Sequence, residues 1–341
     1  MRPFSYDRAV TIDATLAALG HDPRPTPLAG GTTLLDLMKL EVMTPSHLLD
    51  ITGLAEEAPH LADVDATENG GVRIGALARM SDVAKHPLIR EHYPVISQAL
   101  LKGASAQLRN MATMGGNLLQ RTRCVYFRDA TMPACNKRAP GSGCGARQGV
   151  HRLNAVLGGS EACIATHPSD VAVALVALDA TIHLTSTTGE REIVANDFFL
   201  LPGDTPEHET VLLPGELITA ITVPPLPAGT GSHYLKVRDR ESYEFALASA
   251  AVALTIEGGT IAFARMALGG VATKPWRVPE AEAFLIGNPP SAERFAVASD
   301  AMLQGAAPLA QNAFKVDLAR RTLVRALEVT VAGLSGTGGS G

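Results

Sequence analysis

The chain has 341 residues, of which 46% are hydrophobic and 18% charged, a composition that supports two or three soluble domains. The net charge of −5 and the aromatic content of 4% argue against a nucleic-acid partner, and the apolar runs are too short to span a membrane. Residues 1–10 contain neither an apolar signal core nor twin arginines. We therefore expect a cytoplasmic protein, or a periplasmic one exported with a signal-bearing partner.

The segment 1–57 predicts a small α/β unit. A short extended segment precedes a helix over 13–19, a glycine turn over 28–33, a helix over 34–40 and a buried strand over 48–51. A second unit, over residues 58–225, starts with a strand over 72–76. One helix is predicted to begin at the N-cap Ser81 or Asp82. Two further helices are predicted over 95–101 and over 171–178. Strands over 181–184 and 218–223, with a turn at 189–190, complete this unit.

The rest of the chain predicts a separate α+β domain. Residues 225–232 are typical of a linker. Over residues 233–333, strands at 233–237, 250–256 and 261–267 precede helices at 281–286, 294–304 and 315–332. Residues 335–341 predict a flexible tail rich in glycine and serine.

Two glycine pairs are candidates for loops that bind the phosphates of a ligand. Gly30-Gly31 lets the backbone approach a ligand closely, and the helix start that follows offers N–H groups to a pyrophosphate. Gly115-Gly116, within RNMATMGGN, forms a second such loop. A plain tight turn is the alternative for each, and two loops in neighbouring units favour one shared ligand. Asp170 suits either a helix cap or an acceptor for ligand hydroxyls.

Several common enzyme motifs are missing from the sequence. It contains no G-x-G-x-x-G after a strand, no G-x-x-x-x-G-K-[ST] and no H-E-x-x-H. A Rossmann dinucleotide site, a P-loop NTPase and a zinc protease of that class are therefore unsupported.

All four cysteines of the chain lie in one window between positions 124 and 163: Cys124, Cys135, Cys144 and Cys163. Four thiolates complete the ligand set of a [4Fe–4S] cluster or of a structural zinc ion. Structural zinc sites usually contain closely spaced cysteine pairs, which this window lacks, so we favour iron–sulfur. Disulfides are the alternative for an exported protein.

The cysteine window is also basic. Residues 121–152 hold one acid, Asp129, and seven basic residues: Arg121, Arg123, Arg128, Lys137, Arg138, Arg147 and Arg152. Our hypothesis is that these cations offset the negative charge of a cluster and tune its potential. A docking patch for an acidic partner is the alternative.

Several segments of the sequence together resemble a known family. The segments LAGGTTLLDLMK, IGALARMSDVAKHPLIREHYPVISQAL, LRNMATMGGNLLQ and ATHPSDVAVAL resemble the FAD-binding medium subunit of the xanthine dehydrogenase/molybdenum hydroxylase family. The likeness covers nearly the whole chain. The cysteine segments RTRCVYFRD, ACNKRAPGSGC and GSEACIATHPSD resemble the subgroup with an added [4Fe–4S] cluster. That subgroup includes the flavoprotein subunits of periplasmic aldehyde oxidoreductases and of 4-hydroxybenzoyl-CoA reductases.

The resemblance implies an α+β fold with a two-lobed FAD-binding domain of the PCMH/VAO-like type. A cysteine-rich insertion at about 119–163 would interrupt the second lobe. A C-terminal α+β domain like that of the CO dehydrogenase flavoprotein would follow over 233–333.

The resemblance also assigns roles to residues of the two glycine loops and beyond. The FAD pyrophosphate would be held by Thr26, Pro27, Leu28, Ala29, Gly30, Gly31, Thr32, Thr33 and Leu34. Contacts to the adenosine diphosphate or the ribityl chain would come from Gly103, Thr113, Asn117 and Asp170, and contacts near the isoalloxazine from Ile218 and Lys236. The cysteines Cys124, Cys135, Cys144 and Cys163 would ligate the cluster. Well-known relatives have an aromatic residue at the position of Gly103, so stacking there is not expected.

The implied assembly is a heterotrimer. A large subunit with the molybdenum cofactor would oxidise aldehydes to carboxylic acids, and a small subunit would carry [2Fe–2S] clusters. This chain would pass electrons through FAD to an external acceptor, with no catalytic side chain of its own. The alternatives are the flavoprotein subunit of a 4-hydroxybenzoyl-CoA reductase-like or xanthine dehydrogenase-like enzyme, and a zinc-stabilised scaffold subunit without flavin.

Overall fold

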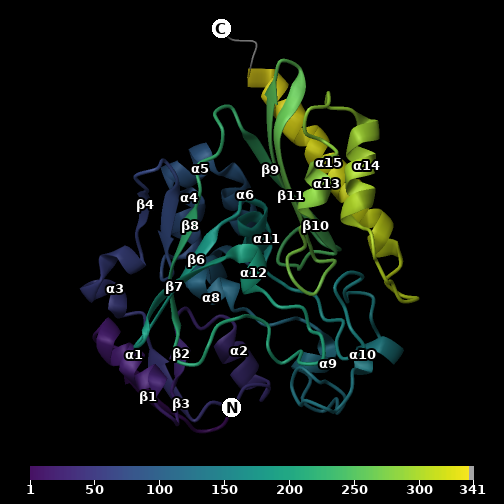
Figure 1. Cartoon of the computed structure of the whole chain (residues 1–341). Coiled ribbons are helices and arrows are strands. Elements are labelled where there is room, and N and C mark those ends of the chain that lie inside the picture. Colours follow the sequence, from purple (N-terminus) through teal and green to yellow (C-terminus); the bar gives the residue numbers. More distant parts are fainter. Residues whose placement is uncertain (338–341) are drawn as a thin grey trace.

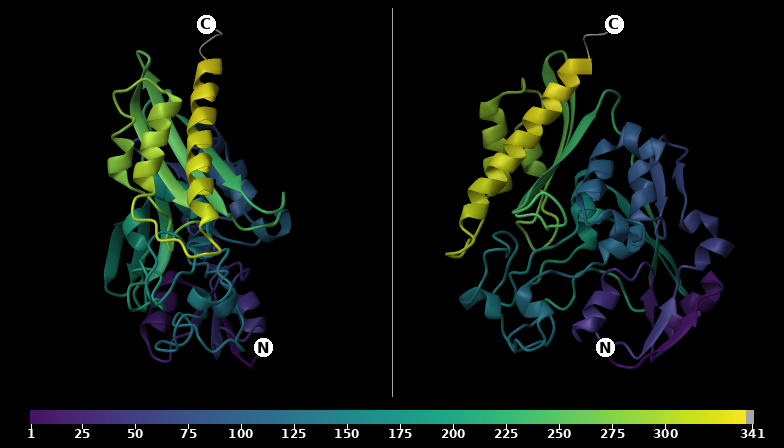
Figure 2. Two further views of the ribbon diagram at one scale, coloured as in Figure 1. Left: turned by 90° about the vertical axis from the view of Figure 1, so that its right-hand side faces the viewer. Right: turned by 180° about the vertical axis from the view of Figure 1, so that it is seen from behind.

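The computed structural model describes residues 1–337, which form two N-terminal lobes, a cysteine-rich segment and a C-terminal layer (Figures 1 and 2). The first lobe is a parallel three-stranded sheet in the order β1-β3-β2. Its elements are β1 (Ser5–Arg8), α1 (Ile12–Gly20), β2 (Thr26–Leu28), α2 (Leu34–Lys39), β3 (His47–Asp50) and α3 (Leu54–Glu57).

Helix α1 is stabilised by an N-terminal cap and by an apolar face. Thr11 precedes the helix and its side chain accepts a hydrogen bond from the N–H of Ala14, which satisfies one of the free donors of the first turn. Leu16 and Leu19, three residues apart on one helix face, are buried in the same cluster as Leu49. The lobe is therefore held by a small apolar cluster, which also includes Leu61 and Leu217 of the second lobe.

The second lobe contains a five-stranded antiparallel sheet in the order β4-β5-β8-β6-β7. The strands are β4 (Val64–Ala66), β5 (Val72–Gly75), β6 (Thr181–Ser186), β7 (Gly189–Val194) and β8 (Leu217–Val223). Around them lie η1 (Pro59–Leu61), α4 (Met80–Lys85), α5 (Pro87–His92), α6 (Pro94–Lys102), α7 (Ala106–Arg109), α8 (Met114–Leu118), α11 (Asp170–Ala177) and α12 (Ala195–Phe198).

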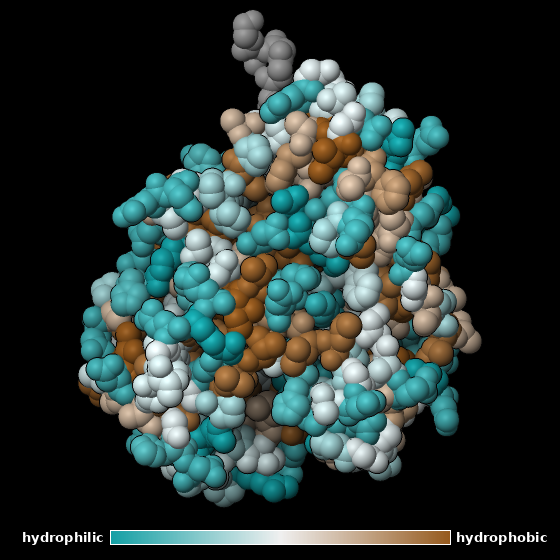
Figure 3. Space-filling view, viewed as in Figure 1, coloured by the Kyte–Doolittle hydropathy of each residue, from teal (hydrophilic) through white to brown (hydrophobic). Residues whose placement is uncertain are grey.

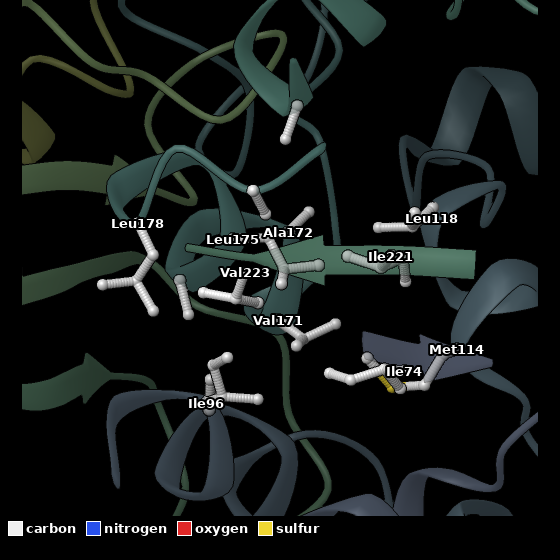
Figure 4. Packing of buried hydrophobic residues seen from close by; sticks show 14 of the residues in the cluster. Ile74, Ile96, Met114, Leu118, Val171, Ala172, Leu175, Leu178, Ile221 and Val223 are labelled. Atoms are coloured by element: carbon white, nitrogen blue, oxygen red, sulfur yellow. The ribbon is translucent and has the colours of Figure 1, made fainter. Parts of the chain in front are cut away.

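Helix α11 lies at the centre of the molecule. Its residues from Val171 to Ala177 are all buried, as expected for a helix that is apolar on every side. Figure 4 shows its side chains beside Ile221 and Val223 of β8, with Ile74 of β5 and Ile96 of α6 close by. This packing fixes the N-terminus of α11, and hence Asp170, relative to the sheet of the second lobe.

The C-terminal part is an antiparallel three-stranded sheet in the order β11-β10-β9 with helices on one face (Figure 2). Its elements are β9 (Gly231–Val237), β10 (Ala248–Glu257), β11 (Thr260–Gly269), α13 (Pro279–Glu282), α14 (Ala292–Met302) and α15 (Phe314–Thr337). Tyr234 and Ala251 on the other face are buried in the same cluster as α6 and α11. The sheet therefore shares a core with the second lobe.

The cysteine window lies beside the first lobe as a largely irregular segment. It contains the short helices α9 (Val125–Arg128) and α10 (Gly145–Gln148) and an isolated β-bridge between Cys135 and Cys144. A small apolar cluster combines Phe127 and Cys135 with Leu37 of α2. Near its end, Val156 and Leu157 are buried in the core of the C-terminal part. The window thus depends on packing against the first lobe and the C-terminal part, rather than on a core of its own.

Most predicted elements are present, with a few corrections. The helix predicted over 281–286 ends at Glu282, the last residue of α13. Ser81 and Asp82 lie inside α4 and do not cap it, because Arg79 occupies the N-cap position without a side-chain bond. The turn expected at 189–190 is already the start of β7. Residues 335–337 of the expected tail belong to α15, and residues 338–341 lie outside the described part. No helix among residues 1–337 has the length and apolar character needed to cross a membrane.

Candidate functional site

A cavity of about 910 Å³ lies between the two N-terminal lobes, the cysteine window and the loop joining β9 to β10. Its volume is at the upper end of the range for small-molecule and cofactor sites. On the face seen in Figure 1, a band of apolar surface crosses the middle of the molecule (Figure 3). Every residue that the family resemblance assigns to FAD lines the cavity: residues 26–34, Gly103, Thr113, Asn117, Asp170, Ile218 and Lys236. Their contacts with a flavin stay a prediction.

The first glycine loop offers free backbone donors to this cavity. Among residues 1–337, no group accepts a hydrogen bond from the N–H groups of residues 30–33, all of which line the cavity. The loop then leads into α2, where the N–H of Leu35 already donates to the carbonyl oxygen of Gly31 at 3.0 Å, so the free donors of the loop are those of residues 30–33. A run of free backbone N–H groups at a cavity wall can donate to the oxygens of a pyrophosphate. The donor set therefore fits the phosphates of FAD.

The two glycine loops touch each other. A methyl group at Gly30 would lie 2.0 Å from the carbonyl oxygen of Met111 and 2.9 Å from the Cα of Ala112. Only a residue without a side chain allows the loops to come this close. The close contact closes one wall of the cavity across the boundary between the lobes.

The second glycine loop is locked to the start of α11. Thr113 caps α8, since its hydroxyl accepts a hydrogen bond from the N–H of Gly116 at 3.3 Å. The Asn117 side-chain oxygen accepts a hydrogen bond of 2.5 Å from the Ser169 hydroxyl, and that hydroxyl also caps α11. Two segments that are distant in sequence therefore meet at one wall of the cavity.

Asp170 is the most strongly held polar side chain of the site. Its carboxylate accepts a hydrogen bond from the Lys236 ammonium at 2.7 Å and another from the Tyr234 hydroxyl at 2.7 Å. Burial raises the pKa of the Asp170 carboxyl, and the neighbouring Lys236 and Tyr234 oppose that rise. A carboxylate has about four lone-pair positions, so two remain for ligand hydroxyls. Gly103 lies beside it, since a methyl group there would stand 3.3 Å from the Asp170 Oδ2 atom.

The loop between β9 and β10 contains residues 238–247, and most of these residues line the cavity. Sequence motifs alone do not predict that this loop belongs to the site. Arg152 of the cysteine window binds Asp239 of this loop through two hydrogen bonds of 2.7 and 2.9 Å. The guanidinium group of Arg123 lies 4.9 Å from the centre of the Phe245 ring. No local signal reveals these partners, because Arg152 and Asp239 lie 87 residues apart along the chain and Arg123 and Phe245 lie farther apart still.

The fold brings the four cysteines toward one another, and all four are free thiols. Cys135 lies close enough to Cys124 to raise the pKa of its thiol. Cys144 and Cys124 lie close enough to Cys163 to raise the pKa of the Cys163 thiol. Within residues 1–337, no three His, Cys, Asp or Glu side chains are grouped tightly enough to hold a single metal ion. Of the four, Cys124 lines the large cavity and the other three do not.

Several N–H groups point at the thiols, and for Cys124 they include the backbone N–H groups of Tyr126 and Phe127. The Asn154 side chain donates a hydrogen bond to the Cys124 sulfur at 3.5 Å, and the Ala165 backbone donates one to the Cys163 sulfur at 3.4 Å. Burial raises the pKa of the Cys124 thiol, while the Asn154 hydrogen bond acts in the opposite direction. Burial also raises the pKa of Cys163, to about 11. N–H···S bonds of this kind stabilise a sulfur that carries negative charge.

The basic residues of the window have partners in the folded chain. Acids from other segments neutralise several of them: Asp36 pairs with Arg123 and Arg128, Glu209 with Arg121 and Lys137, Asp239 with Arg152, and Glu161 with Arg147. Arg138 instead donates to backbone carbonyls of residues 126–132. The seven-to-one excess counted in the sequence is therefore largely offset by acids outside residues 121–152.

The comparisons with known proteins agree with this geometry. Residues 2–226 match the family described as the FAD binding domain in molybdopterin dehydrogenase, and residues 233–330 match the CO dehydrogenase flavoprotein C-terminal domain.

Two curated relatives match most of the chain. The chain is 50% identical to the aldehyde oxidoreductase FAD-binding subunit PaoB of Escherichia coli K12, over 96% of this chain and 98% of that protein. It is 32% identical to the glyceraldehyde dehydrogenase medium chain of Sulfolobus acidocaldarius, over 84% of this chain and 82% of that one.

A solved structure shows the same fold. A chain of reconstituted CO dehydrogenase from Oligotropha carboxidovorans superimposes with a TM-score of 0.76 and 26% identity, over 97% of this chain and 99% of that one. With both domains matched in order and the predicted cofactor residues gathered at one cavity, the chain belongs to the FAD-binding subunit family of the molybdopterin dehydrogenases, or molybdenum hydroxylases.

Proposed function

We propose that this chain is the FAD- and [4Fe–4S]-carrying electron-transfer subunit of a molybdenum-containing aldehyde oxidoreductase. A partner subunit with the molybdenum cofactor oxidises the aldehyde to a carboxylic acid, and a second partner carries [2Fe–2S] clusters. The flavin, when bound, supplies the redox chemistry that links these centres to an external acceptor. The aldehyde-oxidising enzymes named for the two curated relatives above support this choice of substrate.

The observation that carries the proposal is the position of Cys124. This residue lines the cavity assigned to FAD and also lies near Cys135 and Cys163. In a cubane cluster each iron takes one cysteine thiolate, so the four sulfurs need not converge on one atom. The N–H donors to Cys124 and Cys163 suit thiolates that share in cluster charge. A cluster in this window would therefore border the flavin cavity.

Composition and spectrum of the purified protein test the proposal directly. We expect one flavin, about four irons and matching acid-labile sulfide per chain, with flavin absorbance in the visible range. One zinc ion with no flavin would instead support a scaffold subunit and overturn the proposal. The protein should be purified without oxygen, so that loss of iron is not read as absence of a cluster.

The division of labour between subunits has its own test. The chain expressed alone should bind FAD but should not oxidise aldehydes, whereas the complex with its partners should. Aldehyde oxidation by this chain alone would refute the assignment.

The reductase-like alternative differs in the direction of electron flow. Potentials of the flavin and the cluster in the complex decide between the two directions. A cluster far more negative than the flavin would favour a reductase of the 4-hydroxybenzoyl-CoA type.

The compartment stays a prediction made from the sequence. We propose that the chain is cytoplasmic unless a signal-bearing partner exports it. Fractionation of cells that express all subunits, with and without the partner's signal segment, tests this: periplasmic recovery that depends on the partner supports co-export.

A further inference from the structure

Asn154 occupies a position that joins the flavin cavity, the cysteine window and the C-terminal part of the chain. It lines the cavity together with Cys124. Only 6% of its surface is exposed, and it follows Arg152, the last arginine of the window, by two positions. Neither the family comparisons nor the sequence motifs assign it a role.

Both N–H bonds of the Asn154 carboxamide are engaged. Nδ2 donates to the sulfur of Cys124 at 3.5 Å and to the carbonyl oxygen of Ile164 at 3.2 Å. Because the Ile164 carbonyl holds the same nitrogen, the second hydrogen stays directed at the thiol. The orientation of this donor is therefore set by the fold and does not depend on a ligand.

The backbone of Asn154 is held just as firmly from the C-terminal part. Its carbonyl oxygen accepts hydrogen bonds from the Lys315 ammonium at 3.1 Å and from the Asn312 side chain at 3.3 Å. Both of these side chains are fully buried. Lys315 also binds the carbonyl oxygen of Leu153 at 3.0 Å. Such buried donors to successive carbonyls keep the loop from moving away from Cys124.

We propose that Asn154 is a positioning residue that raises the reduction potential of the iron–sulfur centre by donating to Cys124, the thiolate that borders the flavin cavity. The inference rests on the proposed function. Reduction places additional negative charge on the cluster and its ligand sulfurs, so a fixed N–H donor stabilises the reduced state more than the oxidised state. Loss of the donor lowers the potential and shifts electrons toward the flavin.

Three substitutions at this position separate the donor from the packing. Asn154→Leu has a similar volume and no donor. Asn154→Asp keeps the shape and places a carboxylate beside the thiolate. Asn154→Gln keeps a carboxamide and should restore part of the effect.

Asn136 offers the matched control in the same window. Its side chain donates to the carbonyl oxygen of Ala162 at 3.0 Å and accepts from the N–H of Gly143 at 2.7 Å. Asn136→Leu therefore removes a comparable pair of hydrogen bonds that involve no thiol.

The experiment is a redox titration of the assembled complex, in which electron paramagnetic resonance follows the reduced cluster. For Asn154→Leu we expect about a tenfold lower equilibrium constant for reduction, which is about 59 mV for a one-electron couple. The midpoint potential should fall further in Asn154→Asp and less in Asn154→Gln. In Asn136→Leu it should equal that of the unmodified complex.

Two results would overturn the inference. One is a full cluster with an unchanged midpoint in both Asn154→Leu and Asn154→Asp, and the other is an equal shift in Asn136→Leu. If Asn154→Leu does not assemble, the isosteric Asn154→Asp decides by the same titration. An unmodified complex without iron would instead refute the proposed function, so the two failures are distinguishable.

Discussion

Replacing Gly30 by alanine should weaken FAD binding while leaving the chain folded. The added methyl group would lie 2.0 Å from the carbonyl oxygen of Met111 and 2.6 Å from its carbonyl carbon. These are backbone atoms, so no change of rotamer relieves the contact. Ordinary van der Waals contact begins at 3.4 Å, so the two loops must part by more than an ångström, and both loops line the cavity.

The cost can be bounded from known substitutions. Overpacking in a well-packed region destabilises by about 1–3 kcal/mol. If that cost falls on the flavin-bound state, in which the loops must close, the Kd for FAD rises roughly 5- to 150-fold. A displacement of this size also moves the N–H groups of residues 30–33 away from the phosphates that we expect them to bind.

The assay compares flavin content after purification and then titrates the flavin-depleted protein with FAD, using quenching of flavin fluorescence. Gly20→Ala is the matched control, because a methyl group at Gly20 meets only the Thr187 side chain at 3.8 Å and lies within α1. That variant should bind FAD normally and be slightly more stable. An unchanged Kd in Gly30→Ala would refute the reasoning that the loop contact closes the site.

Three other substitutions test the interior of the molecule. Asp170→Asn should reduce the free energy of unfolding by about 3–5 kcal/mol and lower flavin content, since it leaves the Lys236 ammonium, whose side chain is 1% exposed, without a counter-charge. Urea unfolding checks this, and recovery of stability in the double variant Asp170→Leu with Lys236→Met is the expected control. Burial lowers the pKa of His167 from 6.5 to about 3, so its contribution to stability is complete above pH 6.5. As the pH falls from 6.5 toward 3, that contribution is lost, because the unfolded chain takes up the proton first. Between pH 6.5 and pH 3, the unfolding free energy of His167→Gln should therefore fall by less than that of the unmodified protein, with a difference of at most about 5 kcal/mol. Equal pH profiles of unfolding free energy for the two proteins would contradict this role of His167. Arg138→Gln should impair folding of the cysteine window and lower iron content, because Arg138 binds backbone carbonyls, whereas Arg123→Gln should retain iron. Equal iron content in the two variants would argue against this difference.

The substitution Cys135→Ser addresses the role of the cluster itself. A folded complex that retains flavin but reduces its acceptor slowly would place the cluster on the electron path. Failure to assemble would indicate a structural role, which is consistent with the burial of Cys135 against Leu37 and Phe127. Flavin content and rapid-mixing kinetics on the same preparation separate the two outcomes.

Local patterns predict most of the helices and strands, and the exceptions have physical causes. Capping preferences place the start of α4 too late, because Arg79 forms a bridge with Thr113 and this long-range pairing sets where the helix begins. Helix α15 continues past the expected boundary because Leu334 packs against the C-terminal core, which glycine and serine content cannot reveal. In both cases tertiary contact overrides a local preference.

The same distinction applies to the site. Each glycine loop and Asp170 carry their signal within a few residues, so the sequence indicates them one by one. The acidic partners of the arginines carry no such local signal. Asp36 lies 87 residues before its partner Arg123, and Glu209, the partner of Arg121, lies well beyond the end of the cysteine window. A count of charges over one segment therefore does not predict the net charge around that segment in the folded protein.

Helix α2 limits how freely the cysteine window can be transplanted. Along this one short helix, Leu34 borders the flavin cavity, Asp36 pairs with Arg123 and Arg128, and Leu37 is buried against Phe127. The window and this helix are thus complementary surfaces in one unit. A chimera that grafts residues 119–163 into a relative without the cysteines should need Asp36 and Leu37 as well, and the helix would have to be exchanged together with the insertion.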